Sequence, residues 1–282
     1  MRVHQYLKNG FIFLPLFFAG NVTELGQVVD LLWVALAFSF VASAVYIFND
    51  MLDLEADRIH PTKCKRPLAA GQVSRRAGVV LMTALSVSGI VMAFYQSLEA
   101  FFYFVLYLAL QLLYNLRLKH IGIIDVTCVA LGFVIRLYIG KAVSEVYLSD
   151  WLIIMTFLLA LFLALAKRRD DLLIFERSGD IMRQVVTSYN LRFLDHALVL
   201  MGGVVIVAYI NYCTSPQIIA KLDGQSLLPT AFFVVFGILR YLQITYVVED
   251  SSSPTKIILK DKFMMYCVLG WFGLFLYILY LS

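Results

Sequence analysis

Charged residues are scarce in this chain. Only 15% of its 282 residues are Asp, Glu, Lys or Arg, and 61% are hydrophobic, whereas soluble domains are about 25% charged and about 45–50% apolar. This composition excludes an ordinary water-soluble globule. The formal net charge of +4 is too small to indicate a nucleic-acid partner. The four cysteines lie far apart with no CxxC or Cys/His spacing, so neither a zinc site nor a disulfide framework is expected.

Long apolar runs dominate the sequence instead. A membrane-spanning helix needs about 20 mostly apolar residues, and nine candidate stretches lie near residues 10–22, 29–48, 78–96, 100–116, 122–141, 151–166, 195–214, 228–248 and 263–281. We predict an all-α, polytopic membrane helical bundle of about nine transmembrane helices. Eight is the fallback, because the first stretch is short and contains Pro15. Neither a repeat nor a long linker interrupts the pattern, so residues 1–282 are expected to form a single integral-membrane domain.

Positive residues are distributed unevenly between the two sides of the predicted bundle. With the amino terminus inside, 19 of the 23 Lys and Arg residues fall in inner segments. Only Lys141 and Lys221 fall in outer ones, and Arg136 and Arg240 lie within spans. Inner loops of membrane proteins carry this excess of positive charge. We therefore expect a multi-pass protein of the cell (inner) membrane, embedded in the lipid bilayer, with its active-site cavity facing the cytoplasm.

The longest inner loop opens with an acidic pattern. Asn49 is followed by Asp50, Asp53 and Asp57, directly after an apolar stretch. If the helix continues, these carboxylates return to one face, because each residue turns a helix by about 100°. Clustered carboxylates repel one another unless they are protonated or bind a divalent cation, and oxygen ligands suit magnesium bridging to a substrate phosphate. The other interpretation is a solvated acidic helix end, neutralised by basic residues of the same loop.

These acidic residues resemble the first aspartate-rich motif, NDxxDxxxD, of the UbiA superfamily of intramembrane prenyltransferases. Further runs resemble its branch of decaprenyl-phosphate phosphoribosyltransferases and span most of the chain. They are HQYLKN at His4–Asn9, HPTKxxRPxAAG at His60–Gly71, LKH at Leu118–His120 followed by Asp125, GFxxR at Gly132–Arg136, LAKRR at Leu165–Arg169 and FGxxRY at Phe236–Tyr241. Together these runs are far more specific than the first motif alone.

A second inner loop favours this branch. Aromatic-acceptor members of the superfamily carry a second aspartate-rich motif between spans six and seven, where this chain has Lys167-Arg168-Arg169-Asp170-Asp171. Adjacent residues on a helix point about 100° apart, so Asp170 and Asp171 cannot both face one ion as a spaced pair would. We interpret the loop as one that holds phosphate by direct charge. A loop that only anchors the chain at the inner membrane surface is the other interpretation.

Arg136 lies within an apolar stretch, where an arginine costs roughly 2.5–3.5 kcal/mol on insertion scales. It falls on nearly the same face of a helix as Asp125, and that face is expected to look into the bundle. Snorkelling of the arginine to an interface is the alternative.

The resemblance implies transfer of a 5-phosphoribosyl group from phosphoribosyl diphosphate to a polyprenyl phosphate, with Mg2+ as cofactor and release of pyrophosphate. It implies that Asp50, Asp53 and Asp57 are catalytic and that, together with Asn49, they hold the metal. The substrate-binding residues expected are Lys8, Asn49, Lys63, Arg66, Lys119, Asp125, Arg136, Lys167, Arg168 and Tyr189. A lipid phosphate is already an anion at neutral pH, so it needs no strong general base, which fits a sequence whose four histidines form no obvious dyad.

Two other functions stay open at this point. One is UbiA-type prenyl transfer from a polyprenyl diphosphate to an aromatic or glycerol-phosphate acceptor. The other is transport, which is disfavoured because no paired Gly/Pro-broken spans occur in matching halves of the chain. The sequence specifies neither the prenyl chain length nor whether the chain forms a homo-oligomer.

Overall fold

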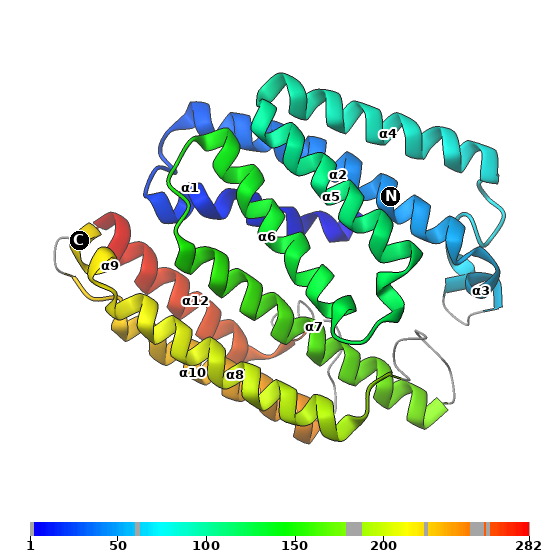
Figure 1. Ribbon diagram of the computed structural model, residues 1–282. Helices are drawn as coiled ribbons and strands as arrows, with labels where there is room; N and C mark the ends of the chain where they lie inside the picture. Colours follow the sequence, from blue (N-terminus) through cyan, green and yellow to red (C-terminus); the bar gives the residue numbers. More distant parts are fainter. Residues whose placement is uncertain are drawn as a thin grey trace. The chain divides into compact units, whose positions relative to one another are not determined.

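The described part of the protein, in a computed structural model, covers residues 3–59, 63–178, 188–222, 225–248, 257 and 260–281. Every regular element in these ranges is a helix, which confirms the predicted all-α class (Figure 1). The chain forms two compact units. Unit 1 comprises Met1–Lys119 and Gly132–Leu148, and unit 2 comprises His120–Leu131 and Ser149–Ser282. The expectation of a single domain over residues 1–282 stays a prediction.

Eight of the described helices are long and apolar enough to cross a membrane. The stretch expected near residues 10–22 forms a shorter apolar helix over Tyr6–Ala19. It consists of the 3-10 helix η1 (Val3–Phe13) and the α-helix α1 (Leu14–Ala19), with Pro15 in the first turn of α1. The fallback count of eight therefore matches the number of long apolar helices among the described residues. The first of the nine stretches is the short one. His60, Pro61 and Thr62 of the HPTK run lie outside the described residues.

Unit 1 is built around α2 (Leu25–Leu52), which packs against α4 (Arg75–Gln96) and α5 (Leu98–Leu116). Figure 1 shows α4 lying alongside α2. The two helices approach closely at Gly89, where a Cβ atom would lie 2.7 Å from the carbonyl oxygen of Ala37. Besides η1 and α1, this unit has the short helices α3 (Leu54–Ile59), η2 (Lys63–Lys65) and η3 (Leu118–His120), the last of which ends at the first residue of unit 2.

Helix α6 (Ile124–Ser144) is divided between the two units. Its residues 124–131 belong to unit 2, and the remainder packs in unit 1, where Ile135 and Ile139 join the apolar core. A Cβ atom at Gly140 would meet the carbonyl oxygen of Ile12 at 2.0 Å, so only glycine lets η1 lie this close to α6.

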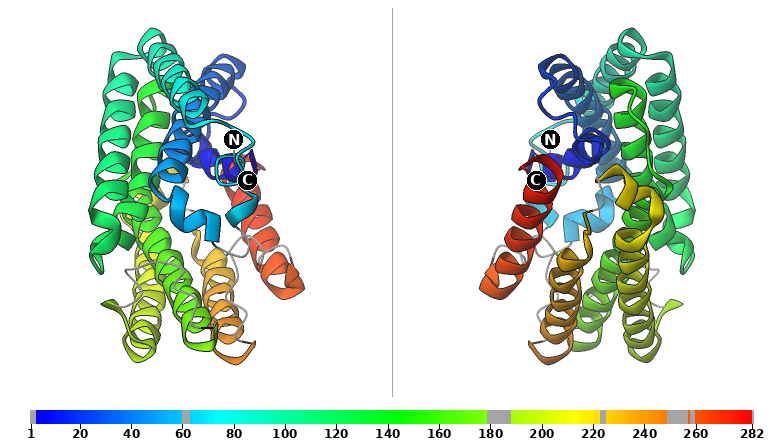
Figure 2. Two further views of the ribbon diagram at one scale, coloured as in Figure 1. Left: turned by 90° about the vertical axis from the view of Figure 1, so that its right-hand side faces the viewer. Right: turned by 90° about the vertical axis from the view of Figure 1, so that its left-hand side faces the viewer.

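Unit 2 contains the carboxyl-terminal helices. In chain order they are α7 (Asp150–Ser178), α8 (Leu191–Thr214), α9 (Pro216–Lys221), α10 (Leu228–Gln243), the π-helix η5 (Ile244–Val248), α12 (Lys262–Leu276) and the π-helix η6 (Tyr277–Leu281). Helix α8 packs against both α7 and α10, and α12 packs against α10 (Figure 2). Their shared core contains Phe162, Leu194, Leu198 and Tyr241.

The run from Lys167 to Asp171 lies inside α7, so the loop predicted for it is wrong. The sequence contains neither glycine nor proline between this run and Ser178, and Lys, Arg and Leu are good helix formers. Leu172 and Leu173 are buried beyond the polar run, so packing holds this part of the helix in place.

Candidate active site

The acidic motif of unit 1 lies where α2 ends and α3 begins. Asn49 and Asp50 are on the last turn of α2, Asp53 is its C-cap residue, and Asp57 is on α3. The N–H of Asp53 donates to the carbonyl of Asn49 at 3.0 Å, and the N–H of Asp57 donates to the carbonyl of Asp53 at 2.8 Å. Helical spacing is therefore retained across the junction of the two helices.

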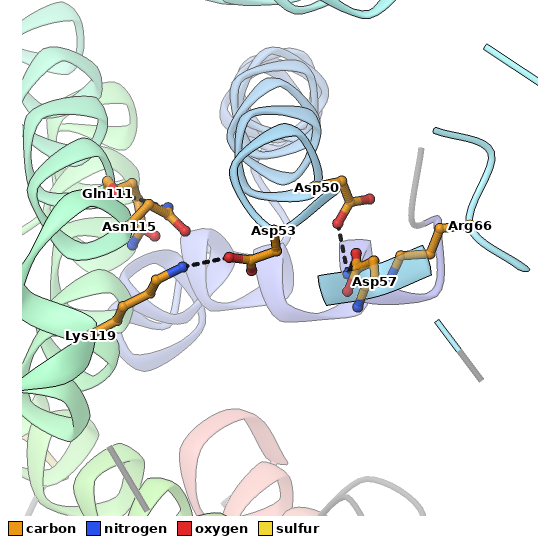
Figure 3. Close-up of polar contacts among 7 residues, drawn as sticks. All are labelled: Asp50, Asp53, Asp57, Arg66, Gln111, Asn115 and Lys119. Carbon is orange, nitrogen blue, oxygen red and sulfur yellow. Dashed lines mark hydrogen bonds and ion pairs between the residues drawn. The ribbon is translucent and has the colours of Figure 1, made fainter. Parts of the chain in front are cut away.

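One guanidinium nitrogen joins two of these carboxylates. Nη1 of Arg66 donates to Oδ1 of Asp50 at 3.0 Å and to Oδ2 of Asp57 at 2.5 Å (Figure 3). The side chain of Asp57 is only 3% exposed, and that of Arg66 is 24% exposed. Asp50 and Asp57 therefore converge, as their seven-residue spacing predicts.

Asp53 pairs with a different cation. Nζ of Lys119, just beyond the end of α5, donates to Oδ1 of Asp53 at 2.9 Å. Lys119 continues a line of polar side chains along α5, formed by Gln111 and Asn115 at intervals of four residues (Figure 3). Asn115 is buried and donates to the backbone carbonyl of Gln111 at 2.8 Å. This line leads from the acidic motif into the interior of unit 1.

The donor chemistry of the motif fits a magnesium ion. Carboxylate oxygens are the hard ligands that this cation prefers, and two of them already meet at one positively charged nitrogen. In the described residues, no three His, Cys, Asp or Glu side chains are placed to share an ion. The contacts explain why, because Asp53 is directed to Lys119 while Asp50 and Asp57 are directed to Arg66.

Arg136 is buried in unit 1 and faces the interior. Its Nε donates to Oδ1 of Asn9 at 3.3 Å and its Nη1 donates to the carbonyl of Gly132 at 2.6 Å. The guanidinium also lies 4.7 Å from the ring centre of Phe38 and 5.3 Å from that of Tyr107. These contacts stabilise the cation within the apolar core and tie η1 to α6, so snorkelling does not describe this arginine.

A second charged network lies in unit 2. Nε of Arg168 donates to the Asp125 carboxylate and its Nη1 donates to Asp171 at 3.1 Å. The Tyr189 hydroxyl donates to the other oxygen of Asp125 at 2.6 Å and accepts from the N–H of Ile123 at 2.6 Å. All three charged side chains are almost completely buried. The network joins α6, α7 and the segment before α8 within unit 2.

Tyr189 also borders a small surface pocket. A hollow of about 350 Å³ is lined by Gly122, Ile123, Ser188, Tyr189, Asn190 and Phe193. Burial, reinforced by the hydrogen bond to Asp125, raises the pKa of the Tyr189 phenol well above its ordinary value. The phenol is therefore a hydrogen-bond donor at neutral pH. Ile123 has a positive φ of 68°, a strained conformation for a β-branched residue, and its N–H is held by Tyr189.

The neighbouring cations of α7 have different surroundings. Arg169 donates to Asp195 at 2.6 Å and to the Thr245 carbonyl of η5 at 2.9 Å, and its guanidinium lies 4.9 Å from the ring centre of Tyr246. Lys167 is only half-buried. Consecutive residues point in different directions on a helix, so Arg168 and Arg169 reach separate sets of partners.

Comparison with known protein families matches residues 11–268 to the UbiA prenyltransferase family. The chain belongs to this family. It is therefore a multi-pass membrane protein and an enzyme of the UbiA prenyltransferase superfamily, whose members typically depend on a divalent metal. The match runs through both units and includes the acidic motif and the Arg168 network.

Curated relatives and a solved structure agree with this membership. The chain is 29% identical to the decaprenyl-phosphate phosphoribosyltransferase of Mycolicibacterium smegmatis, over 97% of this chain and 89% of that protein. It is 30% identical to the decaprenyl-phosphate phosphoribosyltransferase of Mycobacterium tuberculosis, over 96% of this chain and 90% of that protein. A UbiA homologue from Archaeoglobus fulgidus, solved with DMAPP and Mg2+, matches with a TM-score of 0.67 and 17% identity, covering 99% of this chain and 100% of that chain. This last likeness shows the shared fold.

The residues expected to form the site of this UbiA-family chain fall into two groups. Unit 1 contains Lys8, Asn49, Asp50, Asp53, Asp57, Lys63, Arg66, Lys119 and Arg136, and unit 2 contains Asp125, Lys167, Arg168 and Tyr189. Lys8 is exposed on η1, while Asn49 and Lys63 are half-buried near the acidic motif. Their roles stay predictions.

Sequence reasoning missed several polar partners. Asn9 contacts Arg136 and Asp195 contacts Arg169, while Asn115 and Gln111 extend the line that ends at Lys119. The four-residue spacing of the α5 side chains within an apolar helix was the available signal for that line. No local pattern marks Asp195, because its partner comes from another helix.

Proposed function

We propose that this UbiA-family enzyme transfers a 5-phosphoribosyl group from phosphoribosyl diphosphate to a polyprenyl phosphate, releasing pyrophosphate at the cytoplasmic membrane face. The observation that carries the proposal is the likeness, over nearly the whole chain, to proteins named decaprenyl-phosphate phosphoribosyltransferase. The predicted excess of Lys and Arg on inner segments supports the cytoplasmic side.

The acidic motif of unit 1 supplies the groups for binding the diphosphate of the donor. Asp50, Asp53 and Asp57, with Asn49 beside them, are the proposed ligands of magnesium. When bound there, the ion would neutralise charge that develops on the pyrophosphate leaving group. Lys119 lies within hydrogen-bond distance of this motif, and its ammonium adds a contact for phosphate oxygens.

Several phosphate groups must be bound at once, because the donor has a 5-phosphate as well as a diphosphate and the acceptor has a phosphate of its own. Cations serve these groups by charge-assisted hydrogen bonds. The proposal assigns this task to Lys8, Lys63, Arg66, Arg136, Lys167 and Arg168. It assigns contacts with the ribose hydroxyls to Asp125 and Tyr189, which already form one hydrogen-bonded pair.

The attacking group needs little help from the protein. A polyprenyl phosphate is an anion at neutral pH, so its oxygen can attack ribose C1 once the two substrates are held together. This requirement fits a site in which carboxylates and cations predominate. The proposed contribution of the chain is therefore binding, orientation and neutralisation of charge.

Membranes containing the protein, incubated with radiolabelled phosphoribosyl diphosphate, magnesium and a short polyprenyl phosphate, test the proposal directly. We expect label to enter the organic phase on solvent extraction, and we expect no transfer by the Asp53→Ala variant. The variant Lys141→Met, which removes an exposed lysine outside the proposed site, is the matched control and should retain transfer.

A parallel reaction tests the alternative chemistry. It contains a polyprenyl diphosphate with an aromatic or glycerol-phosphate acceptor in place of the labelled donor. Consumption of this pair, with no transfer of label from phosphoribosyl diphosphate, contradicts the proposed reaction and leaves family membership intact.

A further inference from the structure

The contact between Arg66 and the acidic motif places one positive charge where two carboxylates meet. Nη1 of Arg66 is bonded to an oxygen of Asp50 on α2 and to an oxygen of Asp57 on α3, at 3.0 and 2.5 Å. Both oxygens therefore point at a single atom (Figure 3). The buried side chain of Asp57 depends on such a neighbour, because an uncompensated buried charge is strongly destabilising.

A divalent cation uses carboxylate oxygens that converge in the same way. The guanidinium and the ion cannot occupy this place together, because they need the same oxygens and carry charge of the same sign. Binding of the ion through these oxygens therefore requires Arg66 to move. Arg66 is partly exposed and follows the short helix η2, so its side chain has solvent on one side.

Lys119 likewise occupies a carboxylate oxygen of Asp53 that a divalent cation would use. Its ammonium bonds Oδ1 of Asp53 at 2.9 Å, and both side chains are partly exposed. Its flexible four-carbon stem lets the ammonium move away while the backbone stays in place. A cation that draws Asp53 toward Asp50 and Asp57 breaks this pair also.

We propose that Arg66 and Lys119 compete with a divalent cation for the carboxylates of the acidic motif, and that both are released to bind substrate phosphate when the ion binds. This inference rests on the proposed metal-binding role of Asp50, Asp53 and Asp57. It gives the site an order of events. The diphosphate meets two freed cations only after the metal has taken their carboxylates.

Isothermal titration calorimetry, in which magnesium is added to the purified full chain without any substrate, tests the competition. We expect Arg66→Gln and Lys119→Gln to bind Mg2+ about tenfold more tightly than the unmodified protein, which corresponds to about 1.4 kcal/mol. The matched control is Arg58→Gln, because Arg58 is on the same short helix as Asp57 but pairs with the exposed Glu55. Its affinity for Mg2+ should change by less than about twofold.

Equal or weaker Mg2+ binding by both Arg66→Gln and Lys119→Gln overturns the competition, since it means that these cations support the ion or ignore it. The same gain in Arg58→Gln also overturns it, because the effect would then be general electrostatics. If Arg66→Gln does not fold, Arg66→Lys replaces it. Lysine keeps the charge but does not reproduce the reach and planar geometry of the guanidinium, so its Mg2+ affinity should also increase, by a smaller factor.

Binding of inorganic pyrophosphate to the magnesium-saturated protein tests the release. Arg66→Gln and Lys119→Gln should weaken this binding by about tenfold, whereas Arg58→Gln should not change it. Unchanged pyrophosphate affinity in both variants overturns the release.

These titrations are separable from the test of the proposed function, because they contain neither phosphoribosyl diphosphate nor lipid. Failure of labelled transfer with the expected shifts in Mg2+ affinity contradicts only the reaction. Absence of saturable Mg2+ binding in every variant contradicts the inference itself.

Discussion

Replacing Arg168 by methionine removes the cation from the buried network of unit 2. The Arg168 side chain is 2% exposed, and those of its partners Asp125 and Asp171 are 0% and 6% exposed. Removing one partner of a buried ion pair costs about 3–5 kcal/mol, because the remaining charge is left uncompensated. Lys141→Met is the matched control. The pair that Lys141 forms with Glu99 is exposed, and such pairs contribute about 0–1 kcal/mol.

Thermal unfolding of the detergent-purified variants measures this difference. A loss of 3–5 kcal/mol lowers the Tm of a unit of this size by roughly 6–20 °C. The Lys141→Met variant should stay within a few degrees of the unmodified protein. The triple variant Arg168→Met, Asp125→Asn, Asp171→Asn should regain much of the loss, because the two buried carboxylates disappear together with the cation.

Enzyme kinetics distinguish the buried Arg168 from its neighbour Lys167. Lys167 is half-buried on α7, so Lys167→Met should leave the Tm unchanged. It should lower kcat/KM for phosphoribosyl diphosphate by a factor equivalent to about 1.5–3 kcal/mol of lost transition-state stabilisation, the range for a hydrogen bond to a charged group. An unchanged Tm for Arg168→Met refutes the argument from burial. Unchanged kinetics for Lys167→Met assigns this lysine to anchoring at the membrane surface and reopens the prenyl-transfer alternative.

Three further predictions follow from the contacts. Asp50→Ala and Asp53→Ala should abolish labelled phosphoribosyl transfer while the protein still inserts into membranes, and near-normal turnover in either variant contradicts the metal assignment. Arg136→Leu should increase hydrogen exchange in η1, because the bond to Asn9 is lost; Arg136→Lys should increase it less, and equal exchange in all three proteins contradicts this anchoring role. Tyr189→Phe should remove part of the stability loss at alkaline pH. The raised pKa of this phenol keeps it protonated in the folded protein while the unfolded chain ionises. Its contribution to the free energy of unfolding is therefore full below the ordinary tyrosine pKa and declines as pH rises above that value. Identical pH profiles of unfolding for both proteins contradict the assignment.

The acidic motif illustrates how far the spacing of residues predicts a site. The positions of Asp50 and Asp57, seven residues apart, indicated that they meet, and both contact Arg66. Asp53 shares their spacing but pairs with Lys119, because α2 ends at Leu52 and η3, just beyond α5, brings a lysine beside it. Periodicity describes one continuous helix and contains no information about a cation delivered by another one.

For the run from Lys167 to Asp171 in α7, the sequence led to a wrong prediction. The change from apolar to charged residues after residue 166 suggested that the helix stops there, yet α7 continues to Ser178. Lys, Arg and Leu are good helix formers, and buried Leu172 and Leu173 hold the polar turn in place. The same packing buries Arg168 beside Asp125, a pairing that the sequence did not indicate.

The sequence by itself determined the helical class, the approximate positions of the long membrane helices and the family. Backbone hydrogen bonds in a membrane must be satisfied within each helix, so local apolar length is enough to predict these elements. Only the tertiary structure decided which charges pair. Lys119 and Asp53 are 66 positions apart, and Arg168 and Asp125 are 43 apart. Such partners are chosen by the packing of separate helices. For the buried pair of Arg168 and Asp125 the partner is essential, because leaving either charge alone is strongly unfavourable.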